Sequence, residues 1–188
     1  MSAAPVDLLF IQGASTGAHE ADRVLSDALG GTLGPGFRIH FPRMPDEDAP
    51  DNDVWRRRIS TELERTQATF LVAHSAGAAI AADWLLQGAP GAPPGLRGVF
   101  LLAPPFVGPG GWQLDGFHFD RPVDAGALGG LPLHLYFGSA DQTVSPSHAA
   151  LYEALLPAAT IHRLPGCDHQ FGGFMARVAK DVSAVARA

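Results

Sequence analysis

Three residues, Ser75, Asp141 and His169, suggest the chemistry of this sequence, and they follow one another along the chain in this order. A serine hydroxyl is a poor nucleophile at neutral pH unless a neighbouring base removes its proton. Imidazole titrates near neutrality, so a histidine can take that proton and later give it to a leaving group. A carboxylate on the other ring nitrogen fixes the tautomer and stabilises the imidazolium. Together these residue types predict acyl transfer through a covalent intermediate.

Ser75 lies where a buried strand is expected to turn sharply into a helix. The apolar segment 69–73 ends just before it, and a helical pattern follows. A nucleophile elbow has this strand–turn–helix context, and it needs small residues two positions before and after the serine. Those positions hold Ala73, where glycine is usual, and Gly77. The alternative interpretation is that Ser75 only caps the following helix.

The acid and the base each come directly after a strand candidate late in the chain. Asp141 follows the apolar segment 132–137, and His169 follows the segment 160–164. In the α/β-hydrolase fold the chain order is serine, acid, histidine, and this sequence has that order. As an alternative, Asp141 is a simple turn residue. Asp168 is a rival acid, but side chains of adjacent residues rarely pair as this arrangement requires.

Two backbone amides are expected to form an oxyanion hole beside the serine. One belongs to Ala76, at the start of the helix, and the other to Ala14, in the loop after the first strand. Gly13 permits unusual backbone angles there, and Gln12 stands where many hydrolases have a histidine. A glycine-rich loop after a strand also suggests a phosphate site. However, no Lys-Ser or Lys-Thr follows it, and the G-x-G-x-x-G pattern is missing.

The elements that must position these residues alternate along the chain as short apolar runs and longer helical patterns. Nearly continuous apolar runs are typical of parallel strands buried on both faces. The alternation predicts an α/β fold of about six mostly parallel strands in a doubly wound sheet, with helices on both faces. In such a sheet, ligands bind beyond the carboxyl ends of the strands. The expected strands are 6–11, 37–41, 69–73, 98–103, 132–137 and 160–164, and the expected helices are 19–29, 53–66, 76–86, 147–156 and 171–186.

One connection, residues 104–131, is long and rich in glycine and proline. Loops of this length are usually functional or disordered, and the aromatic residues in this one suggest packing over a site. We interpret it as a cap-like insertion within a single domain that spans residues 1–188. The alternative is a surface loop with its own small cluster. The residues expected to contact substrate are Gln12, Gly13, His74, Trp112, Phe117 and Phe119.

Composition excludes several classes of function. The net charge of −6 disfavours nucleic acid and anionic membranes as partners, because phosphate neutralisation needs clustered Lys and Arg. No apolar stretch approaches the ~20 residues of a spanning helix, and the N-terminus does not resemble a signal peptide. The single cysteine allows no intrachain disulfide, so we expect a cytoplasmic protein.

No Cys/His spacing predicts a metal site, and the acidic run 46–48 is interpreted as a solvated loop. We expect no cofactor, and a small-molecule substrate is the only predicted partner.

Several motifs together resemble one family of small hydrolases. They are Gln12-Gly13, Met44-Pro45 before an acidic loop and Trp55, Ala73-His74-Ser75-Ala76-Gly77, Gly138-Ser139-Ala140-Asp141 and Gly166-Cys167-Asp168-His169. In these motifs the sequence is similar to the compact α/β-hydrolases related to retinoblastoma-binding protein 9 and the bacterial YdeN-like proteins. The resemblance implies a six-stranded sheet that lacks the first two strands of larger hydrolases. It also implies serine hydrolase activity through Ser75, Asp141 and His169. The L-x-C-x-E motif for retinoblastoma binding is absent, so no partner role is implied.

The sequence thus predicts a serine hydrolase that acts on ester-like small molecules. It does not distinguish whether the bond cleaved is a carboxylic ester, a thioester or an amide. The elbow with alanine in first place also resembles that of small bacterial lipases. The alternative is a catalytically silent protein of the same fold that binds a partner, because fold alone does not determine function.

Overall fold

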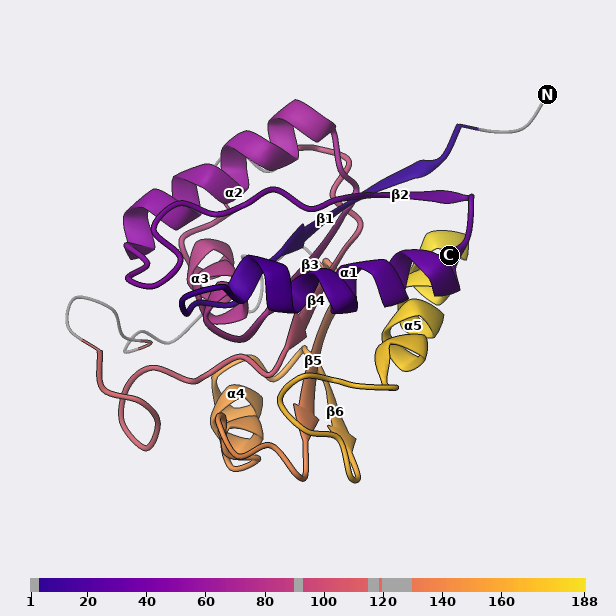
Figure 1. Ribbon diagram of the computed structural model, residues 1–188. Coiled ribbons are helices and arrows are strands. Elements are labelled where there is room, and N and C mark those ends of the chain that lie inside the picture. Colours follow the sequence, from indigo (N-terminus) through magenta and orange to yellow (C-terminus); the bar gives the residue numbers. More distant parts are fainter. Residues whose placement is uncertain (1–3, 90–92, 115–118, 120–129) are drawn as a thin grey trace.

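The computed structural model describes residues 4–89, 93–114, 119 and 130–188, and its centre is one parallel β-sheet (Figure 1). The six strands of this sheet lie in the order β2-β1-β3-β4-β5-β6, and every neighbouring pair is parallel. This arrangement confirms the predicted fold class. The strands are β1 (Val6–Ile11), β2 (Phe37–His40), β3 (Phe70–His74), β4 (Gly98–Leu102), β5 (Leu133–Gly138) and β6 (Thr160–Leu164).

Helices cover both faces of the sheet in the described ranges. Helices α1 and α5 pack together on one face, whereas α2, α3 and α4 cover the other (Figure 1). None of the helices in these ranges has the length and apolar character that crossing a bilayer requires. The helices are α1 (Ala18–Leu33), α2 (Asn52–Thr66), α3 (Ser75–Leu86), α4 (His148–Leu155) and α5 (Met175–Arg187).

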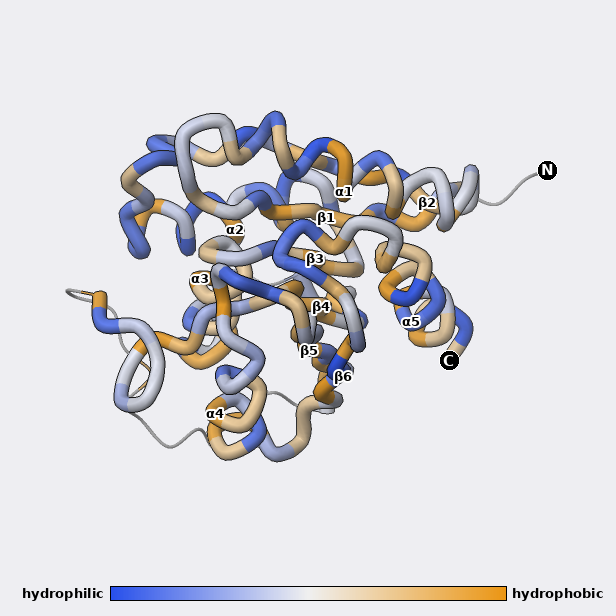
Figure 2. The backbone as a smooth tube through the Cα atoms, turned by 60° about the horizontal axis from the view of Figure 1, so that its bottom comes forward, coloured by the Kyte–Doolittle hydropathy of each residue, from blue (hydrophilic) through white to orange (hydrophobic). Residues whose placement is uncertain are grey.

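The core consists of two apolar layers, one on each side of the sheet. Along β1, Leu8 and Phe10 point into the layer under α1 and α5, and Leu9 and Ile11 point into the other layer. Strands β3 and β4 are buried along their whole length, as their continuous apolar runs indicate. In Figure 2 the hydrophobic colours follow these central strands, and many blue segments lie on the outside of the molecule.

Two helices differ from the predicted bounds for local reasons. The helix expected at 171–186 begins only at Met175, because Phe171 has a φ of 51° and Gly173 a φ of 77°. Left-handed residues such as these cannot continue a right-handed helix. Helix α1, expected to end before Gly30, continues to Leu33, whose side chain packs against the core. The other bounds shift by a residue or two.

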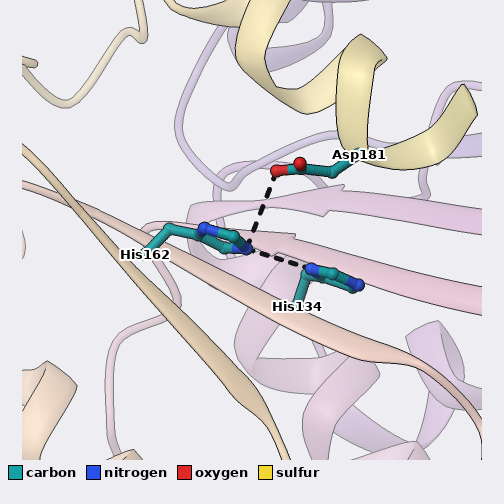
Figure 3. A group of neighbouring side chains, drawn as sticks. All are labelled: His134, His162 and Asp181. Carbon is teal, nitrogen blue, oxygen red and sulfur yellow. Dashed lines mark hydrogen bonds and ion pairs between the residues drawn. The ribbon is translucent and has the colours of Figure 1, made fainter. Parts of the chain in front are cut away.

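Two histidines and an aspartate meet where α5 crosses β5 and β6 (Figure 3). His134 Nδ1 lies 3.0 Å from His162 Nε2, and Asp181 Oδ2 lies 3.7 Å from the same nitrogen of His162. Arg177 donates to Asp181 over 2.9 Å and lies 3.0 Å from His162 Nδ1, and the Tyr136 hydroxyl also donates to Asp181 over 2.9 Å. The guanidinium places a positive charge beside these atoms. The cluster is therefore a hydrogen-bonded clasp that joins α5 to the sheet.

This clasp predicts a loss of stability in acid. Burial lowers the pKa of both His134 and His162 below the ordinary value, which the unfolded chain keeps at about 6.5. Below that pH the unfolded state binds more protons than the folded state, so the free energy of unfolding falls as the pH decreases. The loss is about 1.4 kcal/mol for each unit by which a pKa is lowered. Urea denaturation at about pH 7 and pH 5 measures the effect.

The matched variant for this experiment replaces both rings, His134→Phe and His162→Phe. Phenylalanine keeps the flat packing between the strands but cannot titrate. Burial also lowers the pKa of His148 and His169, so some acid sensitivity remains in the variant. The variant should nevertheless lose less stability between the two pH values than the native chain does. Equal losses in the two proteins would contradict this role for the clasp.

Candidate active site

Ser75 is the first residue of α3 and follows β3 without any intervening loop. Its φ of 52° lies in the left-handed region, which costs a residue other than glycine about 1–3 kcal/mol. A strained turn of this kind places a side chain at the carboxyl edge of the sheet and at the N-terminus of a helix. The helix dipole there stabilises negative charge on or near the serine oxygen.

Gly77 permits the close packing of α3 against the loop after β1. A methyl group built on Gly77 would overlap the backbone carbonyl oxygen of Gln12 and would lie 3.0 Å from a side-chain carbon of Ile11. The elbow and the loop that carries Ala14 therefore approach each other closely only because residue 77 has no side chain. This is the steric demand predicted from the small residues around Ser75.

Gly77→Ala should therefore destabilise the protein by about 1–3 kcal/mol, because the backbone of one of the two segments must move. In a chain of this size each kcal/mol lowers Tm by about 2–4 °C, which differential scanning calorimetry resolves. Gly31→Ala is the matched control, since nothing lies within 4 Å of a methyl group at that position of α1. Alanine is the better helix former, so the control should keep or raise Tm. Similar losses in both variants would argue against this account of Gly77.

Of the three side chains predicted to act together, His169 lies between the other two, within hydrogen-bonding distance of each. His169 Nε2 is 3.0 Å from Ser75 Oγ, and His169 Nδ1 is 2.8 Å from Asp141 Oδ2. The other carboxylate oxygen of Asp141 accepts the amides of Thr143 and Val144, both at 2.8 Å. Asp141 is thus held rigidly at a position where it orients the imidazole.

Backbone contacts between the loops after β5 and β6 bring Asp141 and His169 together. The amide of Ser139 donates to the carbonyl of Leu164 over 3.0 Å, and the amide of Ala140 donates to the carbonyl of Cys167 over 2.9 Å. A methyl group on Gly138 would overlap this Cys167 carbonyl. The glycine at the end of β5 therefore permits the close approach of the acid loop and the histidine loop.

The electrostatic environment keeps the imidazole of His169 neutral near pH 7. Burial lowers its pKa, and the neighbouring imidazole of His74 lowers it further, whereas the hydrogen bond and charge of Asp141 act in the opposite direction. A neutral imidazole that points Nε2 at a hydroxyl can accept its proton. Nε2 of His169 therefore has the position that proton transfer from the Ser75 hydroxyl requires.

The two amides predicted for the oxyanion hole belong to the expected segments. Ala76 is in the first turn of α3, where backbone N–H groups have no partner within the helix. Ala14 follows Gly13, and a methyl group built on Gly13 would lie 3.1 Å from Cβ of Ser75. Among the described residues, neither amide has an acceptor. Both donors are therefore free to bind an oxygen atom.

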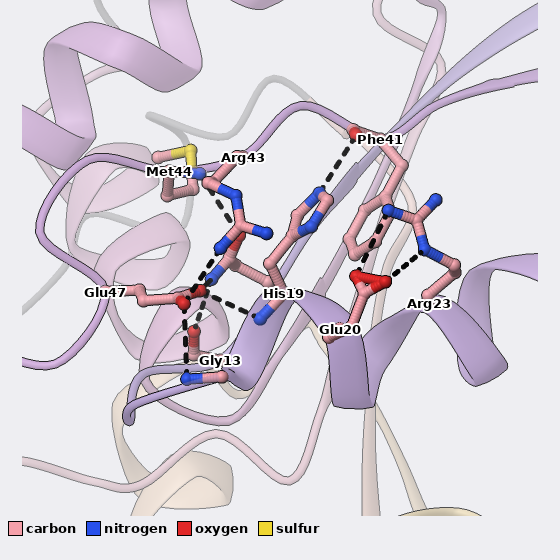
Figure 4. A network of polar contacts seen from close by, with 10 residues as sticks. Gly13, His19, Glu20, Arg23, Phe41, Arg43, Met44 and Glu47 are labelled. Atoms are coloured by element: carbon pink, nitrogen blue, oxygen red, sulfur yellow. Dashed lines mark hydrogen bonds and ion pairs between the residues drawn. The ribbon is translucent and has the colours of Figure 1, made fainter.

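Glu47 anchors the loop after β1, a role that the sequence did not reveal (Figure 4). Its carboxylate accepts the side-chain amide of Gln12 over 2.6 Å and the backbone amides of His19 and Gly17 over 2.9 and 3.2 Å. Arg43 pairs with it over 2.9 Å. These contacts correct the interpretation of the acidic run as a solvated loop for Glu47, which turns inward, whereas Asp46 and Asp48 are exposed as expected. Only a structure identifies which residue of such a run does so.

Gln12 and His74 do not have the roles predicted for them as substrate contacts. Gln12 is 0% exposed, and its side chain joins Glu47 to the amide of Met44. His74 is 1% exposed, and its ring nitrogens lie 2.9 Å from Asp22 Oδ2 and 2.9 Å from the carbonyl oxygen of His169. Both side chains therefore support the site from beneath and are closed to a ligand.

Asp22 is a further residue of this support, and it was not among the residues predicted for the site. It is 2% exposed and accepts the amide of Gly13 over 2.7 Å in addition to its contact with His74. A signal was available, because Asp22 lies on the buried face of α1 between Ala18 and Leu25. A carboxylate on an apolar helix face is almost never fully buried without a partner.

A cavity of about 540 Å³ opens beside the elbow. Trp112 lines it as predicted for a substrate contact, whereas Phe119 packs in the core against Phe106 and Tyr152. Phe117 lies outside the described residues. The walls are mostly apolar, and acidic and amide side chains stand on one side. The lining residues are Ala49, Pro50, Asp51, Asn52, Asp53, Ala76, Ala79, Ile80, Pro105, Val107, Trp112 and Leu114.

The fold is that of an α/β hydrolase, and solved structures of that class superpose on the chain. A serine hydrolase involved in carbazole degradation matches with a TM-score of 0.70 and 12% identity over 99% of this chain and 92% of that one. A protein from Thermus thermophilus matches with a TM-score of 0.65 and 21% identity, covering 100% and 91% of the two chains. A Xanthomonas campestris α/β serine hydrolase described as having no lid matches with a TM-score of 0.63 and 19% identity, covering 100% and 83%.

The family assignment comes from the sequence. A family model named serine hydrolase matches residues 38–164, which is more than half of the chain, and the protein belongs to this family. No curated protein matches the sequence. The predicted class of enzyme, a hydrolase, is thereby confirmed. The narrower resemblance to the relatives of retinoblastoma-binding protein 9 stays a prediction.

Proposed function

We propose that this hydrolase cleaves ester-like small molecules through Ser75 as nucleophile, His169 as general base and Asp141 as the orienting acid. The observation that carries the proposal is the continuous chain of short contacts between these side chains. His169 lies 3.0 Å from the serine oxygen on one side and 2.8 Å from the carboxylate on the other. The left-handed φ of Ser75 supports it, since strain of this kind collects at functional sites.

In the proposed reaction, Ser75 Oγ attacks the carbonyl carbon while His169 Nε2 takes the hydroxyl proton. The carbonyl oxygen gains a negative charge, which the amides of Ala14 and Ala76 stabilise by about 3–4 kcal/mol each. His169 then donates the proton to the leaving group as the acyl-enzyme forms. Water, deprotonated by the same imidazole, hydrolyses the acyl-enzyme and restores the serine.

The cavity supports substrates with a small apolar acyl group. Its volume of about 540 Å³ lies within the range of sites for small molecules, and Ala76 connects it to the nucleophile. Val107, Trp112 and Leu114 form one wall, and all three belong to the connection 104–131. We therefore propose that the connection 104–131 forms a cap-like part of the substrate site.

A fluorophosphonate probe tests the assignment of the nucleophile directly. The probe phosphonylates an activated serine, and peptide mass spectrometry then locates the adduct. We expect the adduct on Ser75 and none on a denatured control. Cys167 should not compete, because burial raises the pKa of its thiol to about 12. No adduct, or one on another residue, would show that the proposal is wrong and favour a catalytically silent binding protein.

A further inference from the structure

A buried histidine–aspartate pair lies directly beneath the proposed active site and takes no part in the reaction described above. His74 is the last residue of β3 and Asp22 is on α1, and their side chains are 2% and 3% exposed. Asp22 Oδ2 lies 2.9 Å from His74 Nδ1 and also accepts the amide of Gly13 over 2.7 Å. His74 Nε2 lies 2.9 Å from the backbone carbonyl oxygen of His169.

The partners of this pair determine where its protons must lie. A backbone carbonyl oxygen can only accept a hydrogen bond, so Nε2 of His74 must carry a proton. Asp22 Oδ2 accepts the Gly13 amide, which is the behaviour of an ionised carboxylate, so Nδ1 of His74 must also carry one. In the alternative, Asp22 is a neutral acid that donates a proton from Oδ2 to His74 Nδ1. This would place the acid proton on the same oxygen that accepts the amide of Gly13. The geometry thus favours an imidazolium paired with a carboxylate.

We propose that Asp22 and His74 form a buried ion pair that positions the oxyanion loop and His169 relative to Ser75. The pair connects three segments: Asp22 holds the loop at Gly13, next to Ala14; His74 holds the backbone of His169; and His74 is itself adjacent to Ser75 in the elbow. A buried ion pair contributes little net stability compared with apolar packing. Stability alone therefore does not account for it, whereas alignment of the two loops does.

The charge of His74 also acts on the base. The rings of His74 and His169 have their centroids 4.9 Å apart. The charged or titratable groups facing His169 are Asp141 from the loop after β5, His74 from the elbow and Asp22 from α1. A positive charge on His74 disfavours a second positive charge on His169 and so extends the activity of the base to lower pH. This consequence rests on the proposed function, whereas the protonation of His74 does not.

The first test therefore measures protonation in the native protein without any substrate. Long-range ¹H–¹⁵N spectra of protein labelled with ¹⁵N-histidine distinguish an imidazolium from either neutral tautomer. At about pH 8 an unperturbed histidine is neutral. We expect one buried histidine to keep both ring protons, and its signal to disappear in His74→Gln, which assigns it. A neutral His74 at that pH would overturn the ion pair, whatever the outcome of probe labelling at Ser75.

The second test measures positioning through the pH profile of ester hydrolysis. In His74→Gln we expect kcat to fall on the order of 100-fold, the cost of misplacing reacting groups by about 1 Å. We also expect the acid limb of kcat/KM to move to higher pH, because the charge beside His169 is gone. A merely structural role would lower the yield of active protein without moving that limb. An unmoved limb with unchanged kcat would contradict the proposal.

His162→Gln is the matched control for this measurement. It also removes a partly buried, hydrogen-bonded histidine, but from the clasp between β6 and α5. Its kcat and its pH profile should equal those of the native protein. Asp22→Asn adds a further arm, because an amide group can occupy the same place but carries no negative charge to balance an imidazolium at His74. It should therefore resemble His74→Gln in kcat, and native kcat in this variant would contradict the coupling.

Discussion

Replacing Ser75 with alanine should reduce the hydrolysis of p-nitrophenyl esters by about 10⁶-fold in kcat. Without the hydroxyl, His169 has no group to deprotonate and no acyl-enzyme can form. Removal of the serine or the histidine of such a cluster costs nearly as much as removal of the whole, because its members act as a unit. The remaining rate comes from the oxyanion amides and substrate binding alone.

The fold should survive this substitution, so the loss can be ascribed to chemistry. Alanine keeps the small side chain that the elbow requires, and the backbone contacts around Gly77 do not involve the hydroxyl. Ser183→Ala is a matched control on α5, which packs on the opposite face of the sheet from α3. It should retain the native rate. If Ser75→Ala hydrolysed the esters as fast as the control, Ser75 would not be the nucleophile.

Asp141→Asn should lower kcat by about 10⁴-fold while leaving the fold intact. The native carboxylate accepts the proton on His169 Nδ1 over 2.8 Å, which leaves Nε2 as a free acceptor toward Ser75. An amide group at this position can donate its own proton to Nδ1, which places the ring proton on Nε2 instead. The imidazole then cannot act as a base. Stopped assays with an excess of enzyme measure the residual rate.

Asp168→Asn is the control that separates the two acids considered from the sequence. Its carboxylate accepts the amide of Gln170 over 3.1 Å at an exposed position, and among the described residues it forms no ion pair with the imidazole of His169. We expect a change in kcat of less than about threefold, as for an ordinary surface substitution. The assignment of the acid would have to be reversed if Asp168→Asn, and not Asp141→Asn, were the damaging change.

Much of the fold was predictable because its physical signals are local and strong. Buried parallel strands require nearly continuous apolar runs, and such runs located all six strands of the structure to within a residue or two. The positions of Ser75, Asp141 and His169 followed from a second rule, that parallel strands bring their carboxyl ends to one edge. The residues directly after β3, β5 and β6 are therefore expected to lie close together, and in the structure His169 contacts both Ser75 and Asp141.

The support beneath the site was not predictable, because it depends on contacts between distant residues. Glu47 turns inward from an acidic run, and Asp22 is buried on α1, whereas Glu20, Arg23 and Asp27 of the same helix are exposed. Gln12 lies close to Ala14 in the sequence, and His74 is adjacent to Ser75. Their side chains nevertheless point away from the substrate side and contact Glu47 and the backbone of His169. Such orientations are set by tertiary packing. The late start of α5 depends on the left-handed φ of Phe171, and this conformation cannot be predicted from a phenylalanine in the sequence.

The separation of the proposed base from the nucleophile has a consequence for biosynthesis. Ser75 and His169 are 94 positions apart, and His169 follows β6, the edge strand that closes the sheet. During translation the N-terminal part of a chain emerges first and can begin to fold. A nascent chain that has completed its elbow still lacks a proton acceptor for the serine. On the proposed mechanism, ribosome-bound precursors and products of premature termination before residue 169 would be inert toward acyl compounds.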